Sequence, residues 1–170
     1  MIQKCSLLTI LEVFFKEPTA IHFIREISRK INLAQTSVRN NINNLKTEGL
    51  IQKKKAKPFD GFVANRESEK FLYYKQVYNF FSLYELRNLI VESLHPQAVV
   101  VFGSYCRGED IEESDIDVLI LSKVKKEINL EKIEKKLGRK VHIMFAEKIE
   151  DLEKKLIKSL INGWTLHGGI

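Results

Sequence analysis

Apolar positions recur with two different periods along the chain, and the change between them indicates two structural parts. In residues 1–66 the apolar residues follow helical spacing, so we expect three helices there, the second over 21–31 and the third over 35–47. Pro18 ends the first helix, because the residue before a proline avoids the helical region. Two short apolar runs around the turn at residues 58–61 then predict a β-hairpin.

The rest of the chain alternates helical stripes with short β-branched runs. A helix without Pro or Gly is expected over residues 67–82, as a connection between the two parts. Continuous apolar runs of five or six residues predict buried strands, and the stripes between them predict helices. The expected strands are 98–102, 116–121 and 141–145, and the expected helices are 83–94, 130–137 and 149–161. The Gly-rich tail, 162–170, is expected to dock, to fray or to contact a second subunit.

Residues of types that often serve in catalysis follow the first of these strands and surround the start of the second. Gly103-Ser104 leaves the first strand, and ten residues separate this pair from Asp115-Ile116-Asp117. Because side chains alternate along a strand, Asp115 and Asp117 are expected to share one face. Two neighbouring carboxylates repel each other unless a cation lies between them, and Mg²⁺ suits that position because it prefers carboxylate and phosphate oxygens. Gly103 lets the backbone approach a phosphate, which exposed N–H groups and the Ser104 hydroxyl would hold.

A surface turn with solvated acids is the simpler alternative, but it does not account for a Gly-Ser pair at a strand end. The whole pattern, Gly-Ser, ten residues and Asp-x-Asp, with Arg107-Gly108 and Ser114, resembles the signature of the DNA polymerase β-type nucleotidyltransferase superfamily. It is most similar to the minimal nucleotidyltransferases, which include the antitoxin partners of HEPN toxins. The resemblance covers residues 83–161.

This resemblance implies an α/β (α+β) domain, here residues 83–170, with a small mixed sheet flanked by helices. It also implies Mg²⁺, or Mn²⁺, as the cofactor, ATP or another nucleoside triphosphate as the substrate, and a HEPN-type toxin as a candidate partner. The implied metal ligands are Asp115 and Asp117, the implied catalytic positions are Asp115, Asp117 and His142, and the implied nucleotide-binding positions are Gly103, Ser104, Arg107 and Ser114.

The third strand departs from the family pattern. Active members carry a third carboxylate there, and the corresponding position in this chain is His142. A neutral imidazole binds softer metal ions more readily than Mg²⁺, and it also accepts a proton near neutral pH. Glu147 lies five residues further on and would point to the opposite face of a straight strand. Two functions therefore stay open: nucleotidyl transfer, and a degenerate fold that serves as a transcriptional regulator or antitoxin.

Three helices followed by a basic hairpin resemble a winged helix-turn-helix domain over residues 1–66. The apolar stripe of the third helix leaves its polar residues available, and Arg, Asn and Gln read base edges in the major groove, while lysines neutralise phosphates. A protein-binding winged helix with a solvated polar face is the alternative. The candidate DNA-binding residues are Gln35, Thr36, Ser37, Arg39, Asn40, Asn43, Lys53, Lys54, Lys55 and Lys57. Winged helices usually bind two half-sites of double-stranded DNA as dimers, so a homodimer is expected.

Charge supports this division of the chain. The formal net charge is +6, but residues 1–66 carry +7 and the remainder carries −1, so the basic excess belongs to the expected DNA-binding part. Two cysteines without metal-ligand spacing give no disulfide framework and no zinc site. No signal peptide and no apolar run long enough for a membrane span is recognisable, so a cytoplasmic protein without membrane contact is expected.

Overall fold

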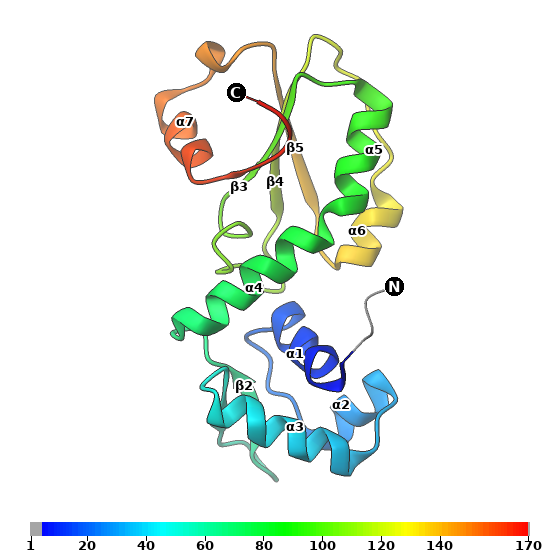
Figure 1. Ribbon diagram of the computed structural model, residues 1–170, viewed down its shortest axis with the longest axis vertical. Coiled ribbons are helices and arrows are strands. Elements are labelled where there is room, and N and C mark those ends of the chain that lie inside the picture. The colour runs from blue at the N-terminus through cyan, green and yellow to red at the C-terminus, as the bar shows by residue number, and fades with distance from the viewer. Residues whose placement is uncertain (1–4, 170) are drawn as a thin grey trace. The chain divides into compact units, whose positions relative to one another are not determined.

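The computed structural model describes residues 5–169 and divides the chain into two compact units, residues 1–75 and 76–170 (Figure 1). The first unit contains α1 (Ser6–Lys16), α2 (Ile24–Ile31), α3 (Gln35–Thr47), β1 (Ile51–Lys54) and β2 (Gly61–Ala64). The helix α4 (Glu69–Ser82) begins in the first unit and ends in the second. The second unit continues with α5 (Tyr84–Leu94), β3 (Ala98–Phe102), β4 (Ile116–Leu121), α6 (Glu131–Leu137), β5 (Val141–Ala146), the 3₁₀ turn η1 (Ile149–Asp151), α7 (Lys154–Ile161) and β6 (Trp164–Gly168).

In the first unit, three helices pack on one another and a two-stranded antiparallel hairpin follows them. Their facing residues are fully buried, and they include Ile10, Phe14, Ile27, Val38, Ile42 and Leu45. The segment between α1 and α2 adds a short bridge to the hairpin, because the N–H of His22 donates to the carbonyl of Phe62 at 2.8 Å and the reverse bond is 2.9 Å long. The helices and hairpin therefore follow the predicted element order, with α3 at its predicted bounds.

The second unit is built on a four-stranded mixed sheet with the order β5-β4-β3-β6. Strand β3 pairs antiparallel with both β4 and β6, whereas β4 and β5 run parallel. A small mixed sheet flanked by helices was the predicted architecture of this part.

The two faces of this sheet carry separate apolar clusters. Alternate residues of β3 and β4, such as Val101 and Val118, pack beneath α5 and α6. The other residues, such as Val100 and Leu119, pack beneath α7. Figure 1 shows α7 on one side of the sheet and α5 and α6 on the other. Because β3 and β4 are covered on both faces over most of their length, they read in sequence as continuous apolar runs.

The C-terminal segment docks on the sheet, which was one of the three predicted alternatives, but the prediction did not include a strand there. Residues 164–168 form β6, an edge strand that pairs Trp164 with Val101 and Gly168 with Ala98. This strand is short and contains the polar residues Thr165 and His167, so its apolar signal is weak. The helix expected over 149–161 is also interrupted, because a 3₁₀ turn precedes α7.

Candidate functional site

The turn after β3 brings Gly103 against the carboxylate of Asp117. Phe102, the last residue of β3, is the antiparallel partner of Asp117 in β4. Gly103 has φ of +85°, in the left-handed region that favours glycine. A β-carbon at this position would lie 2.7 Å from Oδ2 of Asp117. The backbone conformation therefore favours glycine here, and a β-carbon would displace the neighbouring carboxylate.

Asp117 also faces His142 across the parallel pair of strands β4 and β5. The two residues are register partners, and Nδ1 of His142 lies 3.4 Å from Oδ1 of Asp117. The side chain of His142 is 63% exposed and that of Asp117 is 36% exposed, so both are accessible to solvent and to a ligand. They lie on the sheet face that α7 covers further along, because Asp117 alternates with the buried residues Ile116 and Val118 on the opposite face. The position expected for a third carboxylate is thus occupied by an imidazole.

Asp115 lies just outside the strand, since β4 begins at Ile116. Its side chain is exposed, and it lines an open depression of about 400 Å³ together with residues of α6 and of the segment before β5, including Glu134, Arg139 and Lys140. A hydrogen bond from the N–H of Val141, together with Lys140, holds the pKa of Glu134 below its usual range. Within residues 5–169, no three His, Cys, Asp or Glu side chains converge as metal ligands.

The loop between the two motifs is held by its own backbone. The carbonyl of Ser104 accepts hydrogen bonds from the N–H groups of Arg107 and Glu109, both at 3.1 Å. The exposed guanidinium of Arg107 donates to Glu109 at 2.7 Å. Oγ of Ser114 accepts the N–H of Ile111 at 2.9 Å. Ser104 and Arg107 therefore stand at the start of the loop beside Gly103, whereas Ser114 stabilises the turn that precedes Asp115.

A buried polar cluster, which the sequence analysis missed, ties this loop to the domain. Asn79 of α4 donates to Oδ1 of Asp110 at 2.8 Å and to the carbonyl of Tyr105 at 2.9 Å. Nη2 of Arg139 lies 3.5 Å from Oδ2 of Asp110, and Nη1 donates to the carbonyls of Glu112 and Gly138 at 3.1 Å. Asn79 follows the buried Phe71 by eight residues on the same helical face. A polar residue on an apolar stripe is the sequence feature that could have indicated this cluster.

Two ionisable groups in the loop are kept neutral by burial. Burial raises the pKa of the Cys106 thiol to about 12, and this thiol donates to the carbonyl of Val101. Burial also raises the pKa of Tyr105 to about 12, and its hydroxyl lies 2.8 Å from the Ser82 hydroxyl. Both side chains serve the packing beneath the turn, and neither offers a charged nucleophile.

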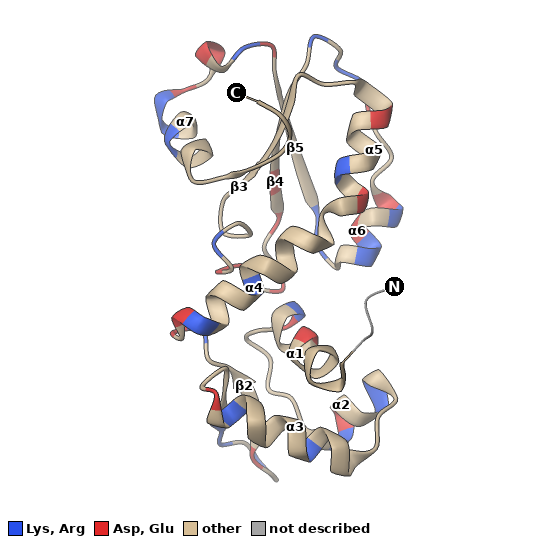
Figure 2. Cartoon of the chain, viewed as in Figure 1, with Lys and Arg blue, Asp and Glu red and all other residues tan. Residues whose placement is uncertain are grey.

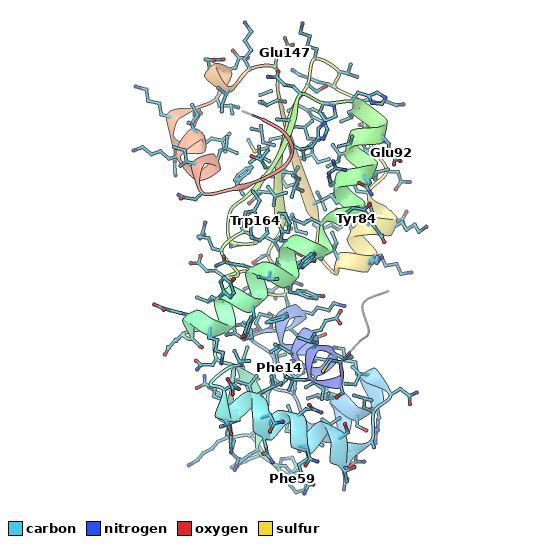
Figure 3. The ribbon with its side chains drawn as sticks, in the orientation of Figure 1. Phe14, Phe59, Tyr84, Glu92, Glu147 and Trp164 are labelled. Carbon is cyan, nitrogen blue, oxygen red and sulfur yellow. The ribbon has the colours of Figure 1, made fainter. Side chains whose placement is uncertain are left out.

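Glu147 does not contribute to this site. It follows the last residue of β5, whereas His142 is the second residue of that strand. In Figure 3, Glu147 lies at the opposite end of the sheet from Trp164, which pairs with Val101 near the Gly103 turn. The structure therefore agrees with the expectation that Glu147 is no substitute for the missing carboxylate.

The residues predicted to bind DNA lie on α3 and on the hairpin of the first unit, and Figure 2 marks the basic ones. The α3 residues are exposed apart from Ser37, which is half-buried, while Val38, Ile42 and Leu45 point into the core. Lys53 and Lys54 end β1, and Lys55 and Lys57 follow in the turn; all four are exposed. These residues are Gln35, Thr36, Ser37, Arg39, Asn40, Asn43, Lys53, Lys54, Lys55 and Lys57.

One of the hairpin lysines has an acidic partner. Nζ of Lys53 lies 2.7 Å from Oδ2 of Asp60, and this hydrogen bond lowers the pKa of Asp60. Asn41 of α3, which was not among the predicted contacts, points inward and donates to the carbonyl of Ser37 at 2.9 Å.

Comparison with known proteins supports the prediction for the second part of the chain. Residues 83–163 match the family model of the nucleotidyltransferase domain, which confirms the nucleotidyltransferase part of the sequence prediction. Comparisons with curated proteins and with solved structures give no significant match. Among the described residues, no helix has the length and apolar character needed to cross a membrane.

Proposed function

We propose that the second unit binds a nucleoside triphosphate, with ATP as the donor, and transfers its nucleotidyl group to a hydroxyl of a protein or another acceptor. The observation that carries this proposal is the contact of Gly103 with Asp117. A left-handed glycine and an accessible carboxylate meet where two paired strands end, within the region that matches the nucleotidyltransferase domain. Phosphate and metal chemistry can meet at such a point, because the backbone is not covered by a side chain.

In this proposal each residue of the turn has a role. The backbone N–H groups that follow Gly103, the Ser104 hydroxyl and the Arg107 guanidinium bind the triphosphate. The acceptor hydroxyl oxygen forms a bond to the α-phosphorus while the bond from that phosphorus to the bridging oxygen breaks. Pyrophosphate leaves with the electron pair, and the hydroxyl proton passes to water. The protein contributes mainly by positioning the two reactants in line.

The residues present suit one divalent cation better than a pair. Asp115 and Asp117 would hold such an ion, which supplies charge stabilisation to the phosphoryl oxygens when it is bound. A site for two Mg²⁺ ions needs more carboxylate charge, and His142 brings none.

For the first unit we propose binding to double-stranded DNA as a winged helix. The support is the position of the polar residues on the outer face of α3 and of the lysines on the adjacent hairpin. Arg39 and Asn43 are in a position to meet base edges, and Lys54 and Lys55 to meet phosphates. A homodimer would place two such units on two half-sites.

One observation favours a second function. His142 occupies the register position beside Asp117 where a third carboxylate would complete an active centre. In the second function the domain binds a nucleotide, or a toxin partner, without transferring anything, and the DNA-binding unit carries out the biological role as a regulator or antitoxin.

Calorimetric titration of ATP with Mg²⁺ or Mn²⁺ tests nucleotide binding, which the enzyme and a nucleotide-binding regulator have in common. We expect binding by the wild type, a loss of at least tenfold in affinity for Asp117→Asn, and no loss for Glu147→Gln, a carboxylate at the other end of the sheet. Binding that survives Asp117→Asn, or no binding at all, would contradict the proposed site. Transfer of label from α-³²P-ATP to an acceptor separates the enzyme from the regulator.

A further inference from the structure

We infer that Asp117 and His142 together bind a divalent first-row transition-metal ion in preference to Mg²⁺. The inference deepens the proposed function, because it assigns the class of cation that accompanies the triphosphate. It starts from a single geometric fact, the approach of Nδ1 of His142 to within 3.4 Å of Oδ1 of Asp117.

This distance suits two ligands of one ion. A well-formed N–H···O hydrogen bond is about 2.9–3.0 Å long, so the contact is long for a hydrogen bond. Two donors that each lie about 2.1 Å from a metal are about 3.0 Å apart at a right angle and about 3.4 Å apart at the tetrahedral angle. The pairing of β4 with β5 fixes the two backbones, because Asp117 and His142 are register partners. The strand pairing therefore keeps the two residues side by side, and their Nδ1 and Oδ1 atoms lie at a separation that one ion can bridge.

The accessibility and the charge of Asp117 and His142 also favour a transition-metal ion. Both side chains are partly exposed, at 36% for Asp117 and 63% for His142, so an ion can reach the pair without a change in the fold. A carboxylate and a metal-bound imidazole together carry a single negative charge. Mg²⁺ prefers oxygen ligands and nearly ideal octahedral geometry, whereas imidazole is a better ligand for ions further along the first transition series.

The pair leaves most coordination positions to other ligands. Among residues 5–169 no three His, Cys, Asp or Glu side chains converge, so the protein supplies few donors at any one point. Triphosphate oxygens and water would complete the coordination. We therefore expect weak ion binding by the protein alone and much tighter binding in the presence of triphosphate.

Pulsed electron paramagnetic resonance of Mn²⁺ bound in the presence of inorganic tripolyphosphate tests this assignment. Mn²⁺ is the weakest nitrogen binder of its series, and tripolyphosphate contains no nitrogen, so a directly bonded ¹⁴N must come from the protein. We expect this coupling in the wild type and its loss in His142→Asn. The matched control is His95→Asn: His95 lies at the other end of β3 and has φ of +44°, a conformation that Asn tolerates.

Competition with Mg²⁺ gives a second measurement that does not depend on activity. We expect His142→Asp to improve Mg²⁺ binding relative to Mn²⁺ by about tenfold, because a carboxylate replaces the nitrogen ligand. Ion and tripolyphosphate binding that requires Asp117 but shows no ¹⁴N coupling would overturn the inference and leave the proposed function standing. Absence of tripolyphosphate binding with every ion tried would overturn both.

Discussion

Gly103 faces the carboxylate of Asp117 so closely that an added β-carbon would be 2.7 Å from Oδ2. This contact joins the two halves of the sequence motif in space, although ten residues separate Gly103-Ser104 from Asp115 in the chain. Both the nearby Asp117 carboxylate and the positive φ therefore favour glycine at position 103. A side chain here would displace the one carboxylate that the proposed function places at the centre of the site.

The first prediction is that Gly103→Ala impairs triphosphate binding far more than a glycine substitution of similar backbone strain. Gly138 provides the comparison: its φ is +68°, and an added β-carbon would meet nothing within 4 Å. Both variants should lose roughly 1–2 kcal/mol of stability, because alanine is strained in the left-handed region. Only Gly103→Ala should also weaken binding of ATP with a divalent ion, by at least tenfold in calorimetric titration. Equal binding by the two variants would contradict the assigned role of the turn.

The strands of the second unit were predictable because their apolar runs are continuous and bounded by turn residues. The runs at 98–102 and 116–121 form strands at the predicted bounds, and the third ends one residue later than predicted. The sequence also predicted that the third strand carries His142 in place of a carboxylate. In the structure, His142 is the register partner of Asp117. Local pattern is sufficient where both faces of a strand are buried.

Other features depend on contacts that no local pattern encodes. Strand β6 contains two polar residues among five and forms because β3 offers an open edge. The cluster of Asn79, Asp110 and Arg139 brings together three residues far apart in sequence. The surroundings of Asp115, which directly precedes β4, likewise come from residues distant in sequence, because it lines a depression together with residues of α6 and of the segment before β5.

The second prediction concerns the hairpin lysines as phosphate contacts. Replacing Lys54 and Lys55 with alanine should weaken binding to double-stranded DNA of any sequence and reduce the slope of log affinity against log salt concentration by about two. Fluorescence anisotropy with a labelled duplex at several salt concentrations measures this. The double replacement of Lys125 and Lys126, which are exposed in the second unit, removes the same charge and should change neither value. A similar loss in both double variants would indicate a general charge effect.

The third prediction is that one of the two cysteines reacts rapidly in the native protein. Cys5 is exposed, whereas Cys106 is buried, and burial raises the pKa of its thiol to about 12. At pH 8 the thiolate fraction of Cys106 should therefore be about a thousandfold below that of an ordinary thiol near pKa 9. Titration with an aromatic disulfide reagent should modify a single thiol quickly, and Cys5→Ser should remove this phase. A fast phase that persists in Cys5→Ser would contradict the burial of Cys106.

The same shift has a consequence for stability at high pH. The folded protein keeps the Cys106 thiol protonated above the pH at which the unfolded chain ionises it. The unfolded state then binds fewer protons, so the contribution of this group to the free energy of unfolding falls as the pH rises from about 9 to about 12.

The fourth prediction concerns the buried ion pair that anchors the loop. Asp110 and Arg139 have side chains that are 1% and 6% exposed, and Arg139 also donates to two backbone carbonyls. Arg139→Met should lower the free energy of unfolding by about 3–5 kcal/mol, because it removes the Arg139 cation from beside a buried carboxylate. Urea unfolding followed by the fluorescence of Trp164, the single tryptophan, reports on this unit. Lys140→Met removes a neighbouring pair between the exposed Lys140 and the half-buried Glu134 and should cost less than about 1 kcal/mol.

A double variant identifies the origin of that cost. If the buried charge is responsible, Asp110→Asn combined with Arg139→Met should be more stable than Arg139→Met alone, because the buried carboxylate that lost Arg139 no longer carries a charge. The hydrogen bond from Asn79 to Oδ1 of Asp110 also has an acceptor in asparagine, so the replacement keeps that contact. If the loss came instead from the packing of the Arg139 side chain, removing the charge of Asp110 would restore nothing. The position of the loop from Gly103 to Asp115 would then depend on the volume of Arg139 rather than on its charge.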